Sequence, residues 1–128
     1  MGIFKIASKM LINEKWNIVY YKSVSGEYPV YDFINKLEVK SRSKIINTID
    51  LLEMYGIKLG TPHVKKVAGT GLWELRILGG DNIRILYIAI TGRAFLLLHG
   101  FIKKVQKTPK KEIKTAVMRL KDYRQRRT

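Results

Sequence analysis

Cysteine is absent from the 128 residues of this sequence. Its absence excludes disulfide bonds, thiolate catalysis and cysteine-ligated zinc within the chain. No apolar run approaches the roughly 18 residues that a membrane-spanning helix needs. The N-terminal stretch is interrupted by Lys5 and Lys9 and therefore lacks the apolar core of a signal peptide. We expect a soluble, cytoplasmic protein with no membrane partner.

Acidic residues are scarce: 10 Asp and Glu stand against 25 Lys and Arg, which gives a formal net charge of +15. The excess is uneven, since residues 103–128 hold 11 Lys and Arg against 2 Asp and Glu. A field of this sign attracts polyanions such as nucleic acid, an anionic membrane or an acidic protein. The alternative is a solvated basic surface that serves solubility.

Several catalytic signatures are also missing. The sequence has no Gly-rich phosphate loop, no His-Glu-x-x-His motif and no Asp cluster for magnesium, and its two histidines lack nearby acidic ligands. We therefore expect no metal and no cofactor. If the protein cleaves RNA, the 2′-hydroxyl beside the scissile phosphate should attack without metal. Arg and Lys would stabilise the charge of the transition state, and a Lys, Tyr or His would move protons. A large RNA-bearing partner would supply much of the positioning.

The length and a hydrophobic content of 46% predict one domain over residues 15–128, preceded by an extension over residues 1–14. Alternation, helical spacing and turn residues predict the elements. They are a strand at 16–21, a helix from Pro29, a helix over 41–55, a loop over 58–71, strands at 72–78, 82–90 and 94–102, and a final helix capped by Thr108. The predicted class is α+β, a small antiparallel sheet with an N-terminal helical hairpin and a C-terminal helix. The helices should pack on one face and leave the other free for a ligand.

Cations lie within or just after these predicted strands. Arg76 and Arg84 belong to neighbouring strands of one hairpin and point to the same side, so they could converge on one phosphate. The alternative is that they pair with carboxylates such as Glu74 and Asp81. After the last strand, Lys103, Lys104 and Lys107 form either a phosphate platform or a solvated strand end.

Three residues are candidates for proton transfer, and each has a structural alternative. Alternation puts His99 on the same side of its strand as Phe95, Leu97, Phe101 and Lys103, where it shuttles a proton or is a core histidine with a satisfied hydrogen bond. The others are His63 in the predicted loop and Tyr87, which also fits the core. Tyr123 is a candidate for stacking on a base.

From Trp16 to about Tyr123 the chain resembles the RelE/HigB toxins of bacterial toxin–antitoxin pairs, with the closest likeness to the phage-derived HigB-like branch. The strongest matches are three runs: Gly71-Leu72-Trp73-Glu74-Leu75-Arg76, Arg84-Ile85-Leu86-Tyr87, and His99-Gly100-Phe101-Ile102-Lys103-Lys104 leading to Lys107-Thr108-Pro109-Lys110-Lys111-Glu112.

The resemblance implies a β-α-α-β-β-β-α domain that enters the ribosomal A site and cuts mRNA. It also implies a neighbouring antitoxin, often with a helix-turn-helix domain. By position it makes Arg84, Arg76, Lys103 and Lys104 the expected catalytic residues. The expected RNA-binding residues are Lys65, Lys66, Lys107, Lys110, Lys111 and Tyr123.

The chain departs from the family in one respect. Some HigB proteins carry acid–base histidines where this sequence has lysines, so the general base stays open between His99, His63, Tyr87 and a lysine. Two further functions also stay open. One is inhibition of DNA gyrase, as in ParE-like members of the superfamily, and the other is non-catalytic binding of nucleic acid.

Overall fold

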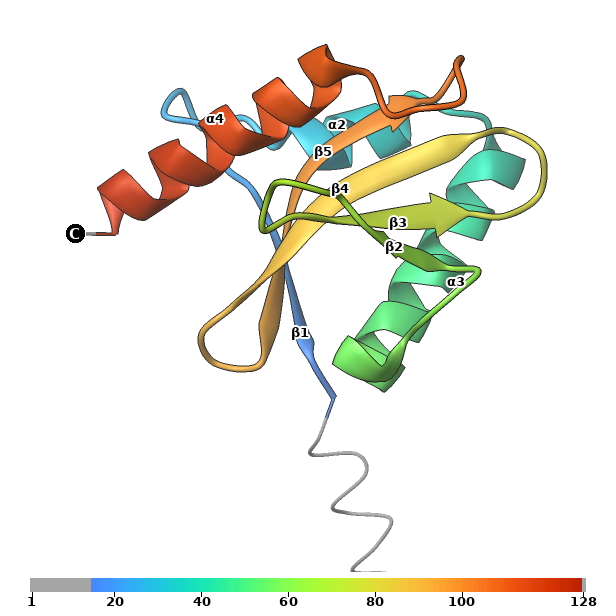
Figure 1. Ribbon diagram of the computed structural model, residues 1–128, viewed down its shortest axis with the longest axis horizontal. Coiled ribbons are helices and arrows are strands. Elements are labelled where there is room, and N and C mark those ends of the chain that lie inside the picture. Colours follow the sequence, from blue (N-terminus) through green and yellow to red (C-terminus); the bar gives the residue numbers. More distant parts are fainter. Residues whose placement is uncertain (1–14, 128) are drawn as a thin grey trace, which may run out of the picture.

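The computed structural model describes residues 15–127, and the extension predicted for residues 1–14 lies outside this range. A five-stranded sheet stands between three helices (Figure 1), and the predicted α+β class is confirmed. The elements in chain order are β1 (Asn17–Tyr20), α2 (Pro29–Asn35), α3 (Val39–Tyr55), the 3-10 turn η1 (Gly56–Lys58), β2 (Val64–Lys66), β3 (Trp73–Ile77), β4 (Ile83–Ile90), β5 (Ala94–Ile102) and α4 (Lys110–Arg126).

The sheet has the order β1-β5-β4-β3-β2. Strands β2 to β5 pair antiparallel, and for β3 to β5 this agrees with the predicted antiparallel sheet. Strand β1 pairs in parallel with β5, which departs from that prediction. Strand β2 lies in the segment predicted to be a loop. It has only three residues, two of them lysines, so it carries no readable alternation.

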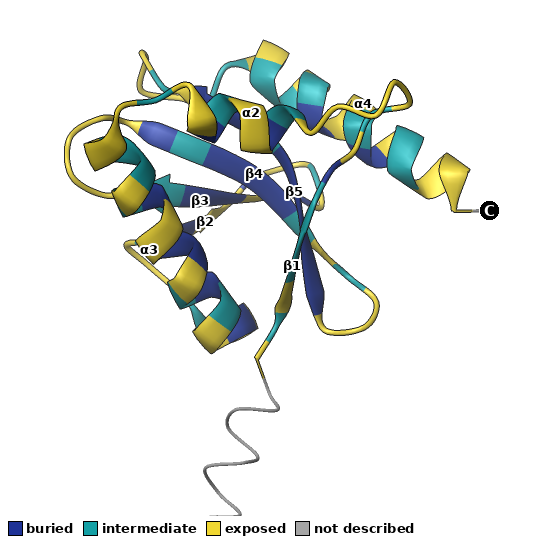
Figure 2. Cartoon of the chain, turned by 180° about the vertical axis from the view of Figure 1, so that it is seen from behind, coloured by how far each residue is buried: buried dark blue, intermediate teal, exposed yellow. Residues whose placement is uncertain are grey.

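Both faces of the sheet are covered, which corrects the prediction of one free face (Figures 1 and 2). Helices α2 and α3 pack on one face through residues such as Val30, Ile45 and Leu52. Helix α4 packs on the other face through Ala116 and Leu120. The prediction failed because β4 and β5 carry large apolar side chains toward both sides, so that each face needs a covering helix.

Strand β5 contains an irregularity that changes which residues share a face. In the register with β4, Leu86 faces His99 and Tyr87 faces Leu97, so Leu98 is an extra residue of a bulge. Both Leu98 and His99 therefore turn toward α4. The predicted face of β5 is correct for Phe95 and Leu97 but wrong for His99 and the residues after it.

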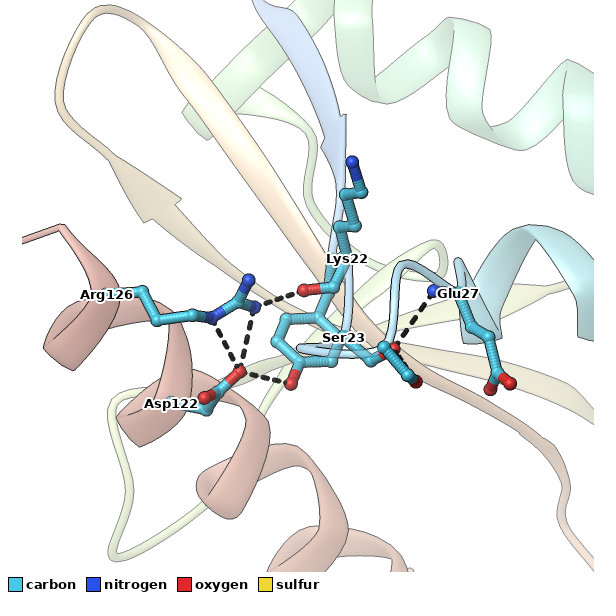
Figure 3. A network of polar contacts seen from close by, with 7 residues as sticks. Lys22, Ser23, Glu27, Asp122 and Arg126 are labelled. Carbon is cyan, nitrogen blue, oxygen red and sulfur yellow. Dashed lines mark hydrogen bonds and ion pairs between the residues drawn. The ribbon is translucent and has the colours of Figure 1, made fainter.

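The far end of α4 is fastened to the start of the sheet by polar contacts (Figure 3). The hydroxyl of Tyr21, which follows β1, donates to Asp122 Oδ2 at 2.5 Å, and Arg126 Nε donates to the same oxygen at 3.1 Å. The guanidinium of Arg126 also donates to the carbonyl of Lys22. The hydrogen bond from Tyr21 lowers the pKa of Asp122, so the carboxylate stays charged in this network.

Candidate functional site

Where α4 begins, the helix leaves part of the sheet face uncovered, and a basic depression opens there. Its volume is about 710 Å³, and it is lined by the end of β3, the start of β4, and the end of β5 with the segment that follows. The lining residues are Arg76, Asn82, Arg84, Ile102, Lys103, Lys104, Val105 and Gln106. The four residues predicted to be catalytic thus come together here. We call this depression the cation site.

Strand register brings the two arginines together. Arg76 and Arg84 are directly opposed in the β3–β4 ladder and lie on the α4 face of the sheet. Side chains in opposed positions are neighbours, and like charges there destabilise a sheet. The two arginines line an open depression, where a bound anion would reduce the repulsion between their guanidinium groups.

Arg84 has an internal counter-ion. Its Nε lies 3.0 Å from Oε1 of Glu74, and the two side chains are 12% and 3% exposed. The contact is close, but neither atom has a well-directed hydrogen bond, so the attraction is chiefly that of an ion pair. Arg84 Nη1 also donates to the carbonyl of Ile83 at 3.0 Å. The pairing with Glu74, one of the sequence-level alternatives, is therefore present for Arg84.

Arg76 differs from Arg84 because Asp81 is engaged elsewhere. Asp81 accepts a hydrogen bond from Ser41 and lies 3.4 Å from Lys44 Nζ, and these contacts lower the pKa of its carboxyl. Among residues 15–127 the guanidinium of Arg76 has no hydrogen bond or ion pair. Of the two arginines, Arg76 is thus the one whose donors are free for a ligand.

Lys103 lies near the same charged groups as the two arginines. Its partial burial lowers the pKa of its ammonium, and the nearby charges of Arg84, Lys65 and Arg76 lower it further, while Glu74 acts in the opposite sense. A lysine whose pKa is lowered by burial and cationic neighbours releases its proton more readily than an exposed lysine. Of the residues in the cation site, Lys103 best fits a proton-transfer role.

His99 forms a bridge between β5 and α4. Its Nε2 lies 2.9 Å from Glu112 Oε1, its Nδ1 lies 3.1 Å from Arg119 Nη1, and its ring stacks on Phe101. Burial lowers the pKa of His99, Arg119 adds to that effect, and the hydrogen bond to Glu112 opposes it. In the neutral tautomer that fits these contacts, Nε2–H donates to Glu112 and Nδ1 accepts from Arg119. This is the satisfied histidine of the structural alternative.

The remaining candidates are dispersed. Lys65 shares the α4 face with Glu74, whereas the next residue, Lys66, is opposite Trp73 and points to the other face. Tyr87 is 3% exposed in the core beneath α3, where burial raises the pKa of its hydroxyl, so it is remote from the cation site. Tyr123 lies near the far end of α4 in another groove. Lys107, Lys110 and Lys111 are exposed around the start of α4.

His63 lies next to β3 at the edge of the sheet. Its backbone carbonyl accepts a 2.7 Å hydrogen bond from the amide of Arg76. Its Nδ1 is buried without a hydrogen-bond partner in the described part of the chain. The backbone contact places His63 beside the cation site, but its side chain does not line the depression.

Two residues near the cation site and His99 have roles that the sequence did not predict. Thr108 was expected to cap α4, but its hydroxyl donates to Glu74 Oε2 at 2.5 Å, and Pro109 occupies the cap position without a side-chain cap bond. Arg119 was not singled out. Its position seven residues after Glu112 puts both on one helix face, which is the signal that could have found the pair around His99.

Residues 15–127 contain neither a metal-ligand cluster nor a helix suited to span a membrane. That range contains no group of three or more His, Asp or Glu side chains placed to hold a metal ion. None of its helices is long and apolar enough to cross a membrane.

Residues 32–121, well over half of the chain, match the family described as "Phage derived protein Gp49-like (DUF891)". The matched span runs from α2 into α4 and contains the four basic residues of the cation site. No curated protein matches the chain.

Proposed function

This chain belongs to the phage-derived Gp49-like family, a family of toxin-like proteins, and we propose that it is the toxin of a toxin–antitoxin pair that cuts mRNA on the ribosome. Membership in a toxin-like family implies in general a cognate antitoxin. The observation that carries the nuclease proposal is the cation site, in which two opposed arginines and a lysine with a depressed pKa share one open depression.

The proposed chemistry uses the RNA as its own nucleophile. The 2′-hydroxyl attacks the adjacent phosphorus, and the bond from phosphorus to the 5′-oxygen of the next nucleotide breaks. Negative charge grows on the phosphate oxygens in the transition state, where the unpaired guanidinium of Arg76 and the outer face of Arg84 would stabilise it. Lys103 would assist proton transfer to or from the reacting oxygens.

The ribosome is needed because the cation site alone does not hold the RNA in the geometry for cleavage. The depression is open, so it supplies charge without enclosing a flexible RNA strand. Attack by the 2′-hydroxyl requires its oxygen in line with the leaving oxygen, and holding that arrangement is worth several orders of magnitude in rate. A partner that already fixes the mRNA, as the A site does, would provide it.

The test is a reconstituted translation reaction in which mRNA ends are mapped by primer extension, with ribosome-free mRNA in parallel. We expect cuts within codons on translating ribosomes alone. Arg76→Ala should lower the cleavage rate by about 100-fold, the typical loss when one charge-stabilising donor is removed. Arg124→Ala, the same change on an exposed turn of α4, is the matched control and should cleave like the parent protein.

Intact mRNA in the presence of folded, antitoxin-binding protein would overturn the nuclease proposal. In that case a supercoiling assay with DNA gyrase would test inhibition of the ParE kind. Equal losses in Arg76→Ala and Arg124→Ala would contradict the assignment of the cation site while leaving the reaction class standing.

A further inference from the structure

Glu74 is an unusual residue for a sheet that faces a basic depression. Within residues 15–127 it is the one charged side chain that is buried, with 3% of its surface exposed. Burying a carboxylate is costly unless its charge and its lone pairs are both met. A buried acid next to a proposed anion site also opposes anion binding. A buried Glu74 at this position therefore needs an explanation in the contacts that it makes.

The contacts of Glu74 supply that reason, because its two oxygens serve different elements. Oε1 faces Nε of Arg84 on β4 at 3.0 Å, and Oε2 accepts the hydroxyl of Thr108 at 2.5 Å. Thr108 lies near the end of the segment that connects β5 to α4, and the same segment carries Lys103, Lys104 and Lys107. One carboxylate thus ties the strand arginine and the lysine-bearing segment to β3.

The lack of a cap at α4 strengthens this interpretation. A threonine just before a helix usually accepts a hydrogen bond from the first amides of the helix. Here α4 has no side-chain cap hydrogen bond, and the hydroxyl of Thr108 is directed at Glu74 instead. The helix forgoes a stabilising contact, and the segment in front of it gains a fixed attachment to the sheet.

From these contacts we propose that Glu74 is the positioning residue of the cation site, fixing the guanidinium of Arg84 on one side and, through Thr108, the lysine segment on the other. This inference rests on the proposed function, since it assigns Glu74 a role in RNA cleavage. Arg84 and Arg76 repel each other across the ladder. The ion pair with Glu74 holds the Nε side of the Arg84 guanidinium. The other nitrogen atoms of that guanidinium are thereby kept beside Arg76.

Glu74→Gln is the sharpest test, because it keeps the shape and an acceptor for Thr108 but removes the charge and places an amide near Arg84. We expect cleavage at saturating ribosome concentration to fall about 10- to 100-fold, the scale of a small displacement of a reacting group. Binding of the programmed ribosome should stay equal or tighten, because a negative charge has been removed. A loss of fold would weaken both quantities together.

Matched variants separate position from charge. Glu38→Gln removes the same charge at the exposed start of α3, on the other face of the sheet, and should leave cleavage unchanged. Thr108→Val should slow cleavage and Thr108→Ser should restore it. In an Arg84→Lys background, which lacks the guanidinium, Glu74→Gln should slow cleavage less than it does in the parent protein. Full, additive effects in that background would overturn the inference.

A second readout is independent of catalysis. In the parent protein the NMR signal of the Arg84 Nε–H should be shifted from the position typical of an exposed arginine, because the Glu74 carboxylate lies 3.0 Å from Nε, and Glu74→Gln should move it toward that position. If the parent protein cuts no mRNA yet the signal behaves in this way, the proposed function fails and the positioning geometry stands. If cleavage by Glu74→Gln equals that of the parent protein, or if the Arg84 Nε–H signal has the same position in both, the role of Glu74 is refuted.

Discussion

At the scale of single residues, the two arginines of the cation site should differ sharply in what they do for stability. Arg84 and Glu74 form a nearly buried pair. Removing one member of such a pair leaves an uncompensated buried charge and costs about 3 kcal/mol. Arg84→Ala should therefore unfold at clearly lower urea, whereas Arg76→Ala, which breaks no ion pair, should stay within about 0.5 kcal/mol of the parent protein.

A double variant provides the control for this prediction. Arg84→Ala combined with Glu74→Gln no longer buries an unpaired carboxylate, so it should recover part of the lost free energy of unfolding. Additive losses in the double variant would show that the pair contributes through packing alone. The comparison also indicates that Arg76→Ala is the safer variant for activity measurements, because a loss of activity in Arg84→Ala could reflect unfolding.

At the scale of elements, the contact of β5 with α4 should depend on pH through His99. The pKa of this histidine is lowered from 6.5 in the folded protein, chiefly by burial. Below pH 6.5 the unfolded chain therefore binds a proton that the folded chain excludes. The free energy of unfolding should fall as the pH drops from 6.5 to the folded pKa and then stop responding to this group.

Urea unfolding at pH 7.5 and 5.5 measures this effect, with His99→Gln as the comparison. The parent protein should lose more stability on acidification than the variant does. Asp81 and Asp122 also have lowered pKa values, but their ordinary value is 3.8, so they titrate below this window. An identical loss in the parent protein and in His99→Gln would exclude His99 as the source.

The elements also show what the sequence could and could not predict. Alternation correctly assigned the faces of β3 and β4, and with them the meeting of Arg76 and Arg84, because both strands are regular. It failed at His99 because nothing in a run of leucines marks the bulge at Leu98. Thr108 was misassigned for a related reason: a local capping rule cannot reveal a carboxylate 34 residues away in the sequence.

At the scale of the whole molecule, the question is how much of the +15 charge acts at the cation site. Cations line the depression, surround the start of α4 and continue to its far end. A charge spread in this way attracts RNA from every side. Only the part that neutralises phosphates in the bound complex enters the dependence of affinity on salt, since each such contact releases a counterion.

The salt dependence of binding to a single-stranded RNA therefore separates the two contributions. Replacing Arg76 and Lys104 with alanine should reduce the slope of log K against log salt by about 1.4, at roughly 0.7 for each lost phosphate contact. Replacing Lys121 and Arg124, which are exposed on α4 away from the depression, makes the same change in net charge and should leave the slope nearly unchanged. If both pairs lower the slope equally, the RNA is bound by the overall charge, and the arginines opposed across β3 and β4 form no phosphate site.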